Sequence, residues 1–375
     1  MRTVAALILV VVILCLFGLV MLGSTSGPHG ERLFGNPNYF TVRQLLWMAA
    51  GLGAGAAAAR VDYHFWMKLA WPMFGAALLL LALVYVPGIG LTIKGSSRWL
   101  RLPLGLTFQP SELAKFAAIN AMAYWYGNRR RERDGFKGGI LYPGMILGSM
   151  LGLIVFETDF GATILIGATG GLMMFVGGAP FLWLAAFGAS AAGALAWMIS
   201  KNMQRMSRIM AFLDPEKYAQ DEAFQLLNAL YAFVAGGAWG VGLGESLQKR
   251  FYLPEAHTDF IFAIVGEELG IVASLGVVAL FVVFLVCGLR IGGRAPDPGG
   301  RLMAFGITVL VSMQAALNIG VVTGRLPTKG LPLPFISFGG TSLVVLLFMV
   351  GVLLNVARQS APDAAPARGR RRKAA

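Results

Sequence analysis

Long apolar stretches separated by short polar segments run through most of the chain. A helix needs about 20 apolar residues to cross the hydrocarbon core of a bilayer. By this measure the sequence predicts ten spanning helices, at residues 4–24, 41–59, 69–87, 110–127, 140–157, 160–177, 180–200, 260–289, 301–323 and 341–357. The pattern therefore predicts an all-α integral membrane protein with about ten transmembrane helices.

The composition supports this prediction. The chain is 57% hydrophobic and 13% charged, whereas soluble domains carry about 25% charged residues. The first apolar stretch, residues 4–22, is longer than the roughly 7–15 apolar residues of a signal peptide, so we expect a helix that is not removed. Cys15 and Cys287 lie in apolar runs and are interpreted as buried small hydrophobic residues. The three histidines and two cysteines show no metal-ligand spacing, so no metal site is predicted.

The basic residues predict the orientation. An even number of spans places both termini on one side, and cytoplasmic segments of membrane proteins carry an excess of Lys and Arg. With the N-terminus inside, the inner segments hold 17 basic residues and the outer segments hold 6, apart from the long loop 201–258. We therefore expect cytoplasmic termini and a large extracytoplasmic loop between helices 7 and 8.

The chain divides into two parts by composition. Residues 1–357 are predicted to form one polytopic transmembrane domain. Residues 358–375 are rich in Ala, Pro and Arg and are predicted to be a disordered cytoplasmic tail. Its run Arg370–Lys373 fits the anionic head groups of membrane lipids better than nucleic acid. The net charge of +13 is therefore not taken as a sign of nucleic-acid binding.

One carboxylate stands out because Asp259 lies where the long outer loop meets the next apolar stretch. Acidic groups at such a boundary are costly to place and are functional candidates. The alternative is that Asp259 caps the helix that follows. Glu267 and Glu268 lie about 12 Å further along that helix at 1.5 Å per residue. They are expected to face the bundle or a wet cavity, either neutralised by partners or lining a polar path.

Two further polar segments lie near the outer side, before and at the start of the fourth span. The first, residues 95–101, carries Arg98, Trp99 and Arg101. The second carries Glu112 and Lys115, which are three residues apart and so share a helix face. A local ion pair and a role in substrate binding are both compatible with this spacing, and an ammonium suits a phosphate.

Two outer turns complete the set of polar features. The turn Glu157–Asp159 is interpreted as a solvated helix connection and cap in preference to a catalytic pair. Residues 326–340 contain three Pro and three Gly, which excludes a regular helix. Non-helical backbone at membrane depth is tolerated where it packs in protein or lines a cavity. Pro332, Pro334 and Ser337 are therefore expected in the wall of the site that Asp259 serves.

These segments together resemble the SEDS family (shape, elongation, division and sporulation) of membrane proteins. The matching motifs are GSSRWLRL, FQPSELAK, ETDFGATIL, YLPEAHTDFIFAIVGEELG and LPTKG followed by LPLPFISFGG, in this order between residues 95 and 340. The last two are more similar to the cell-division branch, FtsW, than to the rod-elongation branch, RodA. Thr158 stands where the family more usually has a Pro.

The resemblance implies a peptidoglycan glycosyltransferase that polymerises lipid II into glycan strands, acting in cell division at the outer face of the bacterial cytoplasmic membrane, at the septum. It implies that Asp259 is the catalytic carboxylate and that residues around it bind substrate: Arg98, Trp99, Glu112, Lys115, His257 and Thr258. The implied partners are lipid II, the nascent glycan strand, a class B penicillin-binding transpeptidase and other divisome membrane proteins.

The implied chemistry fits the residues. An inverting transfer from a polyprenyl pyrophosphate to a 4-hydroxyl, giving a β-1,4 bond, requires one base and no covalent intermediate. Asp259 is the predicted base, and Lys115, Arg98 and Arg101 are predicted near the pyrophosphate. No tightly bound cofactor is expected, although Mg²⁺ or Mn²⁺ on the donor pyrophosphate is chemically compatible.

Two other functions remain open from the sequence alone. In a lipid II flippase, charges within the spans would line a polar path: Glu112, Lys115, Glu267 and Glu268. In a scaffold without enzymatic activity, Asp259 would have no catalytic role.

Overall fold

The computed structural model describes residues 2–93, 96–101, 106–128, 135–201, 203–221, 223–250 and 253–360. Parts of four predictions lie outside these ranges: residues 361–375 of the basic tail, the inner basic cluster Arg129–Arg133, Gly95 and Leu102 of the GSSRWLRL motif, and Tyr252 of the YLPEAHTDFIFAIVGEELG motif.

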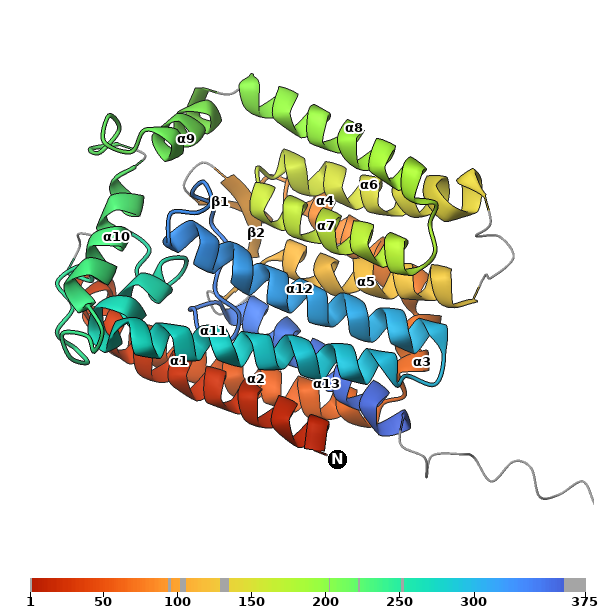
Figure 1. Ribbon diagram of the computed structural model, residues 1–375, viewed down its shortest axis with the longest axis horizontal. Coiled ribbons are helices and arrows are strands. Elements are labelled where there is room, and N and C mark those ends of the chain that lie inside the picture. The colour runs from red at the N-terminus through yellow and green to blue at the C-terminus, as the bar shows by residue number, and fades with distance from the viewer. Residues whose placement is uncertain are drawn as a thin grey trace, which may run out of the picture.

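A helix lies at each of the ten predicted spans (Figure 1), which confirms the all-α class. These helices are α1 (Arg2–Phe34), α2 (Tyr39–Arg60), α4 (Ala70–Leu83), α5 (Pro110–Asn128), α6 (Tyr142–Phe156), α7 (Phe160–Val176), α8 (Phe181–Ser200), α11 (Ile261–Gly293), α12 (Pro298–Val322) and α13 (Gly340–Gln359). The first of them, α1, continues well past its predicted end at residue 24 into a polar stretch.

Six of the described helical segments are long and apolar enough to cross a membrane. They are α1, α8, α11, α12, α13 and Lys137–Phe156, in which the π-helix η2 (Lys137–Leu141) runs into α6. The helices α4 and α7 are apolar but shorter, and α2 and α5 are less apolar. The count of ten crossings and the orientation stay predictions.

The long helices run side by side in one bundle (Figure 1). The start of α1 and the end of α13 lie at the same end of this bundle, together with the short helix α3 (Tyr63–Lys68). The segment that precedes α11 lies toward the opposite end. Because the first and last described helices begin and end at the same end of the bundle, the chain crosses it an even number of times, as predicted.

Two predicted loops contain regular structure. The loop 201–258 includes α9 (Met203–Leu213) and α10 (Phe224–Gly236), and α10 packs against α11. With 13 residues, α10 is too short to register as a span. The loop before α5 forms a small antiparallel sheet, in which β1 (Gly90–Ile93) pairs with β2 (Ser96–Arg101) and β2 pairs with β3 (Thr107–Phe108).

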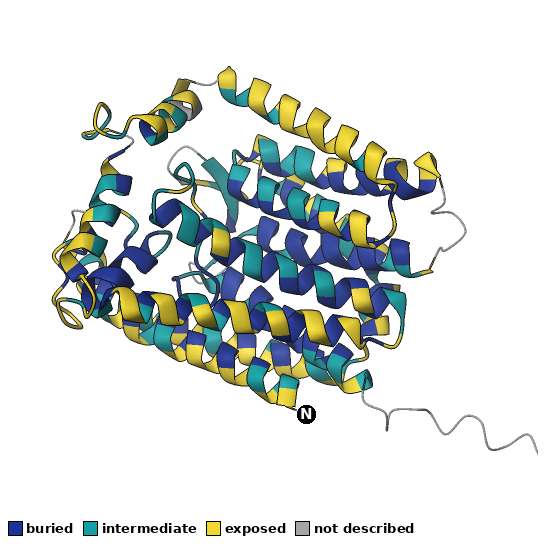
Figure 2. Ribbon diagram, viewed as in Figure 1, coloured by how far each residue is buried: buried dark blue, intermediate teal, exposed yellow. Residues whose placement is uncertain are grey.

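The core lies around α5 and α12, whereas α8 lies outside it. Most residues of α5 are buried, and α5 contacts α4, α6, α7 and α12. No residue of α8 is buried, and most of its length is exposed (Figure 2), including the large apolar residues Phe181, Leu182 and Trp197. Lipid tails are as apolar as leucine, so an exposed apolar helix is stable in a bilayer although it would be costly in water.

Close helix packing relies on glycine where α2 meets α13. A Cβ at Gly351 would lie 2.1 Å from the Gly55 carbonyl oxygen, so only residues without a side chain permit this approach. Small residues at such contacts are typical of membrane helices, because van der Waals packing drives their association.

The helix α11 lies at its predicted place and is kinked at Gly270. Gly270 has φ +77° and ψ −177°, and the segment after α10 bonds to the backbone around the kink. Val241 N donates to the Glu267 carbonyl oxygen at 2.9 Å, and Ile271 N donates to the Gly237 carbonyl oxygen at 3.0 Å. The kink therefore holds the α10–α11 connection against the bundle.

We expect Gly270→Ala to destabilise the protein. Alanine would be strained at this φ, and its Cβ would lie 2.4 Å from the Ala238 carbonyl oxygen. Backbone strain and overpacking each cost about 1–3 kcal/mol, which corresponds to a fall of roughly 5–10 °C in the thermal unfolding midpoint of the purified protein. The control is Gly276→Ala in the same helix, where the added Cβ meets open space. Equal midpoints for the two variants would contradict this account.

Candidate active site

A cavity of about 1300 Å³ lies between the ends of several helices and the segments that connect them. Its lining includes charged side chains from several parts of the chain: Arg43, Arg98, Glu112, Arg208, Asp221, Glu255, Asp259 and Lys329. Seven predicted site residues line it: Arg98, Trp99, Glu112, His257, Thr258, Asp259 and Pro332. Typical small-molecule sites measure roughly 300–1000 Å³, so this cavity has room for a large polar ligand.

Asp259 reaches the cavity from a coil of turns directly before α11. The backbone amides of Thr258 and Phe260 both donate to the Glu255 carbonyl oxygen, at 3.1 and 3.2 Å. Phe260 occupies the N-cap position of α11. Asp259 is therefore not the helix cap, which was the structural alternative that the sequence left open.

Asn318 on α12 ties the Asp259 backbone to the proline-rich segment. Its side-chain amide donates to the carbonyl oxygens of Asp259 and Leu331, at 2.7 and 2.6 Å. A Cβ at Gly330 would lie 3.0 Å from Asp259 Oδ2. The glycine backbone thus lies against the carboxylate, and one buried asparagine fixes both segments.

The proline-rich segment is also bonded to the turn that carries Asp259. Ser337 Oγ donates to the Thr258 carbonyl oxygen at 2.6 Å, and Phe338 N donates to the His257 carbonyl oxygen at 3.0 Å. The third proline of the segment, Pro334, is buried and does not line the cavity. The segment is non-helical as predicted, and it forms one wall of the cavity.

Two glutamines of neighbouring helices satisfy further backbone groups of this segment. Gln314 donates to the Pro332 carbonyl oxygen at 2.8 Å. Gln44 on α2 donates to the Ser337 carbonyl oxygen at 3.1 Å and accepts from Gly339 N at 3.3 Å. These bonds meet the requirement that buried backbone groups be paired.

His257 and Thr258 have different surroundings. The His257 ring is buried, with its centroid 5.2 Å from the His29 ring and 4.8 Å from the Phe40 ring. Thr258 Oγ1 donates to Glu255 Oε2 at 2.9 Å. Both residues border the cavity, but each side chain also has a packing or bonding role within the protein.

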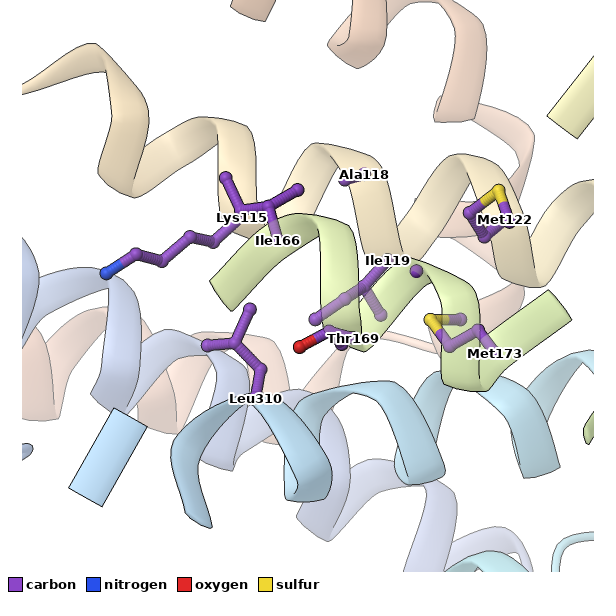
Figure 3. Close-up of a pocket in the computed structure, with 9 residues that line it drawn as sticks. Lys115, Ala118, Ile119, Met122, Ile166, Thr169, Met173 and Leu310 are labelled. Atoms are coloured by element: carbon purple, nitrogen blue, oxygen red, sulfur yellow. The ribbon is translucent and has the colours of Figure 1, made fainter. Parts of the chain in front are cut away.

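Lys115 does not reach the cavity. Its side chain is 1% exposed, and its ammonium donates to the two Glu112 oxygens at 2.8 and 2.9 Å and to Gln314 Oε1 at 3.0 Å. Its stem lines a narrow gap between α5, α7 and α12 (Figure 3). The ion pair that the spacing suggested is present. The predicted contact with phosphate is not supported, because all three ammonium donors are used.

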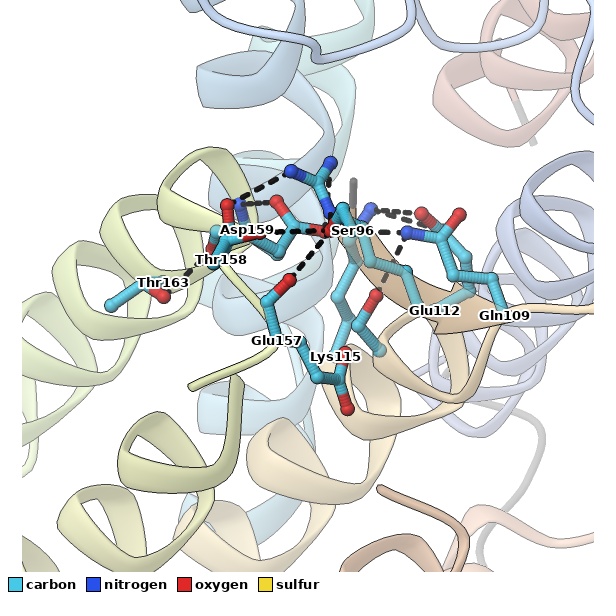
Figure 4. A network of polar contacts seen from close by, with 11 residues as sticks. Ser96, Gln109, Glu112, Lys115, Glu157, Thr158, Asp159 and Thr163 are labelled. Atoms are coloured by element: carbon cyan, nitrogen blue, oxygen red, sulfur yellow. Dashed lines mark hydrogen bonds and ion pairs between the residues drawn. The ribbon is translucent and has the colours of Figure 1, made fainter. Parts of the chain in front are cut away.

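Arg98 on β2 joins the strand to the turn between α6 and α7. Its Nε donates to Ser96 Oγ at 2.6 Å and its Nη2 to the Thr158 carbonyl oxygen at 2.8 Å, while Nη1 lies 3.9 Å from Asp159 Oδ2. Ser96, Thr158 and Asp159 lie close together in this network (Figure 4). Trp99 lines the cavity, but Arg101, the last residue of β2, is exposed and does not. The structure therefore does not place Arg101 with the other predicted site residues, and its role near the pyrophosphate stays a prediction.

The turn Glu157–Asp159 is buried, not solvated as expected. Asp159 caps α7 as predicted, with Oδ1 accepting from Ala162 N at 3.0 Å. Neither carboxyl oxygen of Glu157 has a hydrogen-bond partner within the described ranges. Burial and the nearby charge of Asp159 raise the pKa of Glu157 to about 8, while Arg98 acts in the opposite direction.

Glu267 and Glu268 bind the connection between α10 and α11. Glu267 accepts from Ser246 Oγ and, at 2.9 Å, from Leu247 N. Glu268 accepts from Lys249 Nζ and Ser24 Oγ, both at 2.7 Å. Neither glutamate lines the cavity. Lys249 neutralises Glu268, as one of the two alternatives predicted, and hydrogen bonds from neutral groups satisfy Glu267.

Sequence reasoning missed several residues of the site: Arg43, Gln44, Gln314, Asn318 and Lys329. Asn318 and Gln314 are single amides within an apolar span, and a buried amide needs partners. That signal was available in the sequence. The partners themselves lie 13 to 199 residues away along the chain, so no local pattern identifies them.

Known proteins resemble this chain over most of its length. Residues 5–361 match the family of cell cycle proteins of FtsW, RodA and SpoVE. A relative from Geobacter sp. (strain M18), named probable peptidoglycan glycosyltransferase FtsW, is 42% identical over 349 residues, covering 93% of this chain and 95% of the relative. A relative of the same name from Methylomonas methanica is 41% identical over 356 residues, covering 92% and 90%.

Two solved structures share the fold. One, described as showing structural coordination of polymerization and crosslinking by a peptidoglycan synthase complex, has a TM-score of 0.79 and 27% identity over 95% of this chain and 98% of the other. The other is the crystal structure of the rod shape determining protein RodA of Thermus thermophilus, with a TM-score of 0.70 and 26% identity over 94% and 96%.

Glu157 is expected to make the fold less stable at alkaline pH. Its pKa of about 8 in the folded protein exceeds the value near 4.3 of an unfolded glutamate. The proton's contribution to stability is therefore complete below about pH 4 and is lost as pH rises through 8. Glu157→Gln should raise the thermal unfolding midpoint relative to wild type at about pH 8.5, with a smaller difference at about pH 5. The exposed control Glu216→Gln should leave the unfolding midpoint unchanged at both pH values. If Glu157→Gln shifted the midpoint equally at both pH values, titration of Glu157 would not explain the loss of stability.

Proposed function

The chain belongs to the cell cycle protein family of FtsW, RodA and SpoVE, and we propose that it polymerises lipid II with Asp259 as the base. It is a multi-pass membrane protein and a peptidoglycan glycosyltransferase, supported by 42% identity over 93% of the chain to a relative of that name. The identity of the base and of the substrate contacts is our proposal.

In the proposed reaction, the 4-hydroxyl of the acceptor sugar attacks the anomeric carbon of the donor. The bond from that carbon to the pyrophosphate breaks as the new glycosidic bond forms, which inverts an α-linked donor to a β-1,4 product. Asp259 takes the hydroxyl proton, and the electron pair leaves with the polyprenyl pyrophosphate. A single base is sufficient because pyrophosphate is a good leaving group.

The observation that carries this proposal is the placement of Asp259. Asp259 lines the 1300 Å³ cavity, its carboxylate lies against the backbone of Gly330, and Asn318 holds its backbone carbonyl oxygen. A base held by its surroundings in one position loses little free energy in reaching the reactive geometry. Glu112 also lines the cavity, but its two oxygens are bonded to Lys115, which makes it a poorer base.

A tightly bound metal cofactor is not part of this proposal. Within the described ranges, no three His, Cys, Asp or Glu side chains are grouped so that they could hold a metal ion. We propose that Mg²⁺ or Mn²⁺, where one is used, arrives on the donor pyrophosphate.

The buried charges favour a polymerase over a flippase. A flippase would need polar groups along a path through the bundle. Lys115 is instead saturated by Glu112 and Gln314, and Glu267 and Glu268 hold the α10–α11 connection. The charged side chains that do border a large space are those of the cavity around Asp259.

We further propose that the protein works with a class B penicillin-binding transpeptidase in the bacterial cytoplasmic membrane, at the division septum. The support for the partner is the similarity to a peptidoglycan synthase complex in which polymerization and crosslinking are coordinated. The support for division is that the relatives carry the name FtsW, together with the LPTKG motif. The cavity and the Asp259 turn would face outward, where the crosslinking partner acts.

Asp259→Ala and Asp259→Asn should abolish glycan synthesis. A positioned general base contributes about 10²–10⁴ in rate, and both variants lack it. The measurement is polymerisation of labelled lipid II by the purified protein with a cognate class B transpeptidase. Exposed Glu216→Gln is the control and should keep wild-type activity. Polymer formation by Asp259→Asn at the wild-type rate would eliminate Asp259 as the base.

Gly330→Ala should slow catalysis without unfolding the protein. The added Cβ would lie 3.0 Å from Asp259 Oδ2, so the carboxylate must shift by a few tenths of an ångström. A displacement of about 1 Å can cost roughly 10²-fold in rate, and a smaller shift costs proportionally less. We expect kcat to fall by up to about tenfold, with an unchanged thermal unfolding midpoint. Wild-type kcat in this variant would show that the contact does not restrain the base.

A further inference from the structure

Four basic side chains line the cavity, Arg43, Arg98, Arg208 and Lys329, and they differ in exposure and in how far the protein already uses them. Arg208 on α9 is exposed to solvent. Arg98 donates to Ser96 and to the Thr158 carbonyl oxygen. Arg43 lies over the Tyr39 ring, 4.8 Å from its centroid. Lys329 lines the cavity and is partly buried, yet no contact with another described residue engages its ammonium.

Lys329 stands on a restrained stretch of backbone. Thr328, Lys329 and Gly330 line the cavity in succession, and Asn318 holds the next residue through the Leu331 carbonyl oxygen. Gly330 lies against the Asp259 carboxylate. The lysine is therefore next in sequence to the residue that touches the proposed base, on a segment whose position is set by hydrogen bonds.

An unpaired ammonium in a partly buried place is costly without an anion. Burial lowers the pKa of Lys329, because the charged form loses hydration. A phosphate group in the cavity would offset that cost, since an ammonium is a compact point charge with three donors. The protein's own carboxylates do not fill this role among the residues that the structure describes.

We infer that Lys329 binds the pyrophosphate of the polyprenyl-linked donor and stabilises the negative charge that develops as this group leaves. The inference rests on the proposed function. It replaces Lys115 and Arg101, which do not line the cavity, with a cation that does. Fixed positive charge at a developing oxyanion is one of the larger contributions to catalysis.

The test is direct binding to the purified full-length protein in nanodiscs of neutral lipid. The probes are undecaprenyl pyrophosphate and undecaprenol, which differ only in the phosphates. Lys329→Ala should weaken pyrophosphate binding by about tenfold or more and leave undecaprenol binding unchanged. Lys329→Arg keeps the charge and should retain most of the affinity. Lys217→Ala removes an exposed lysine outside the cavity lining and should match wild type.

Two results would overturn the inference. One is wild-type affinity of folded Lys329→Ala for the pyrophosphate. The other is Lys329-dependent binding of phosphatidylglycerol as tight as that of the pyrophosphate, which would assign the site to a membrane lipid.

Asp259→Asn separates this inference from the proposed function. It should bind the pyrophosphate like wild type while making no polymer. If wild type makes no polymer but binding still depends on Lys329, the proposed function fails and the phosphate site stands. If wild type polymerises and Lys329→Ala binds normally, only the phosphate site fails.

Discussion

The non-helical backbone between α12 and α13 imposes the constraint on which the site depends. An amide or carbonyl group buried in an apolar environment without a partner costs several kcal/mol, and hydrocarbon offers no water to supply one. Gln44, Gln314 and Asn318 supply the missing partners. Asn318 also bonds the Asp259 carbonyl oxygen. One of the side chains that satisfies this backbone, Asn318, therefore also fixes the backbone position of Asp259.

The same requirement separates the charged residues into two groups. Lys115, Glu267 and Glu268 are buried, and protein groups satisfy each of them. They stabilise the frame around the cavity, and each would be costly to leave unpaired. Asp259 and Lys329 line the cavity, where a bound ligand can supply a hydrogen-bonding or charged partner.

The helices were predictable from the sequence, but their connections were not. Apolar length alone located a helix at every predicted span, because the bilayer demands that length. The kink at Gly270 depends on bonds to Val241 and Gly237, and α10 is too short to stand out in an apolar chain. Asp259 was identifiable because an acid at a membrane boundary is rare. The partners that hold it were not, since Asn318 is 59 residues away along the chain.

The failed prediction for Lys115 shows that a charge within a membrane segment can serve the structure and need not bind a ligand. A costly charge invites a functional reading, and that reading suggested Lys115 as a phosphate ligand. The structure gives Lys115 three protein acceptors, which leaves no donor for a substrate. Lys329 belongs to the LPTKG motif, but its position in a loop did not suggest a phosphate ligand. It borders the cavity with its donors unused. Unused donors that face a space of ligand size are thus better evidence for a binding role than depth in the membrane.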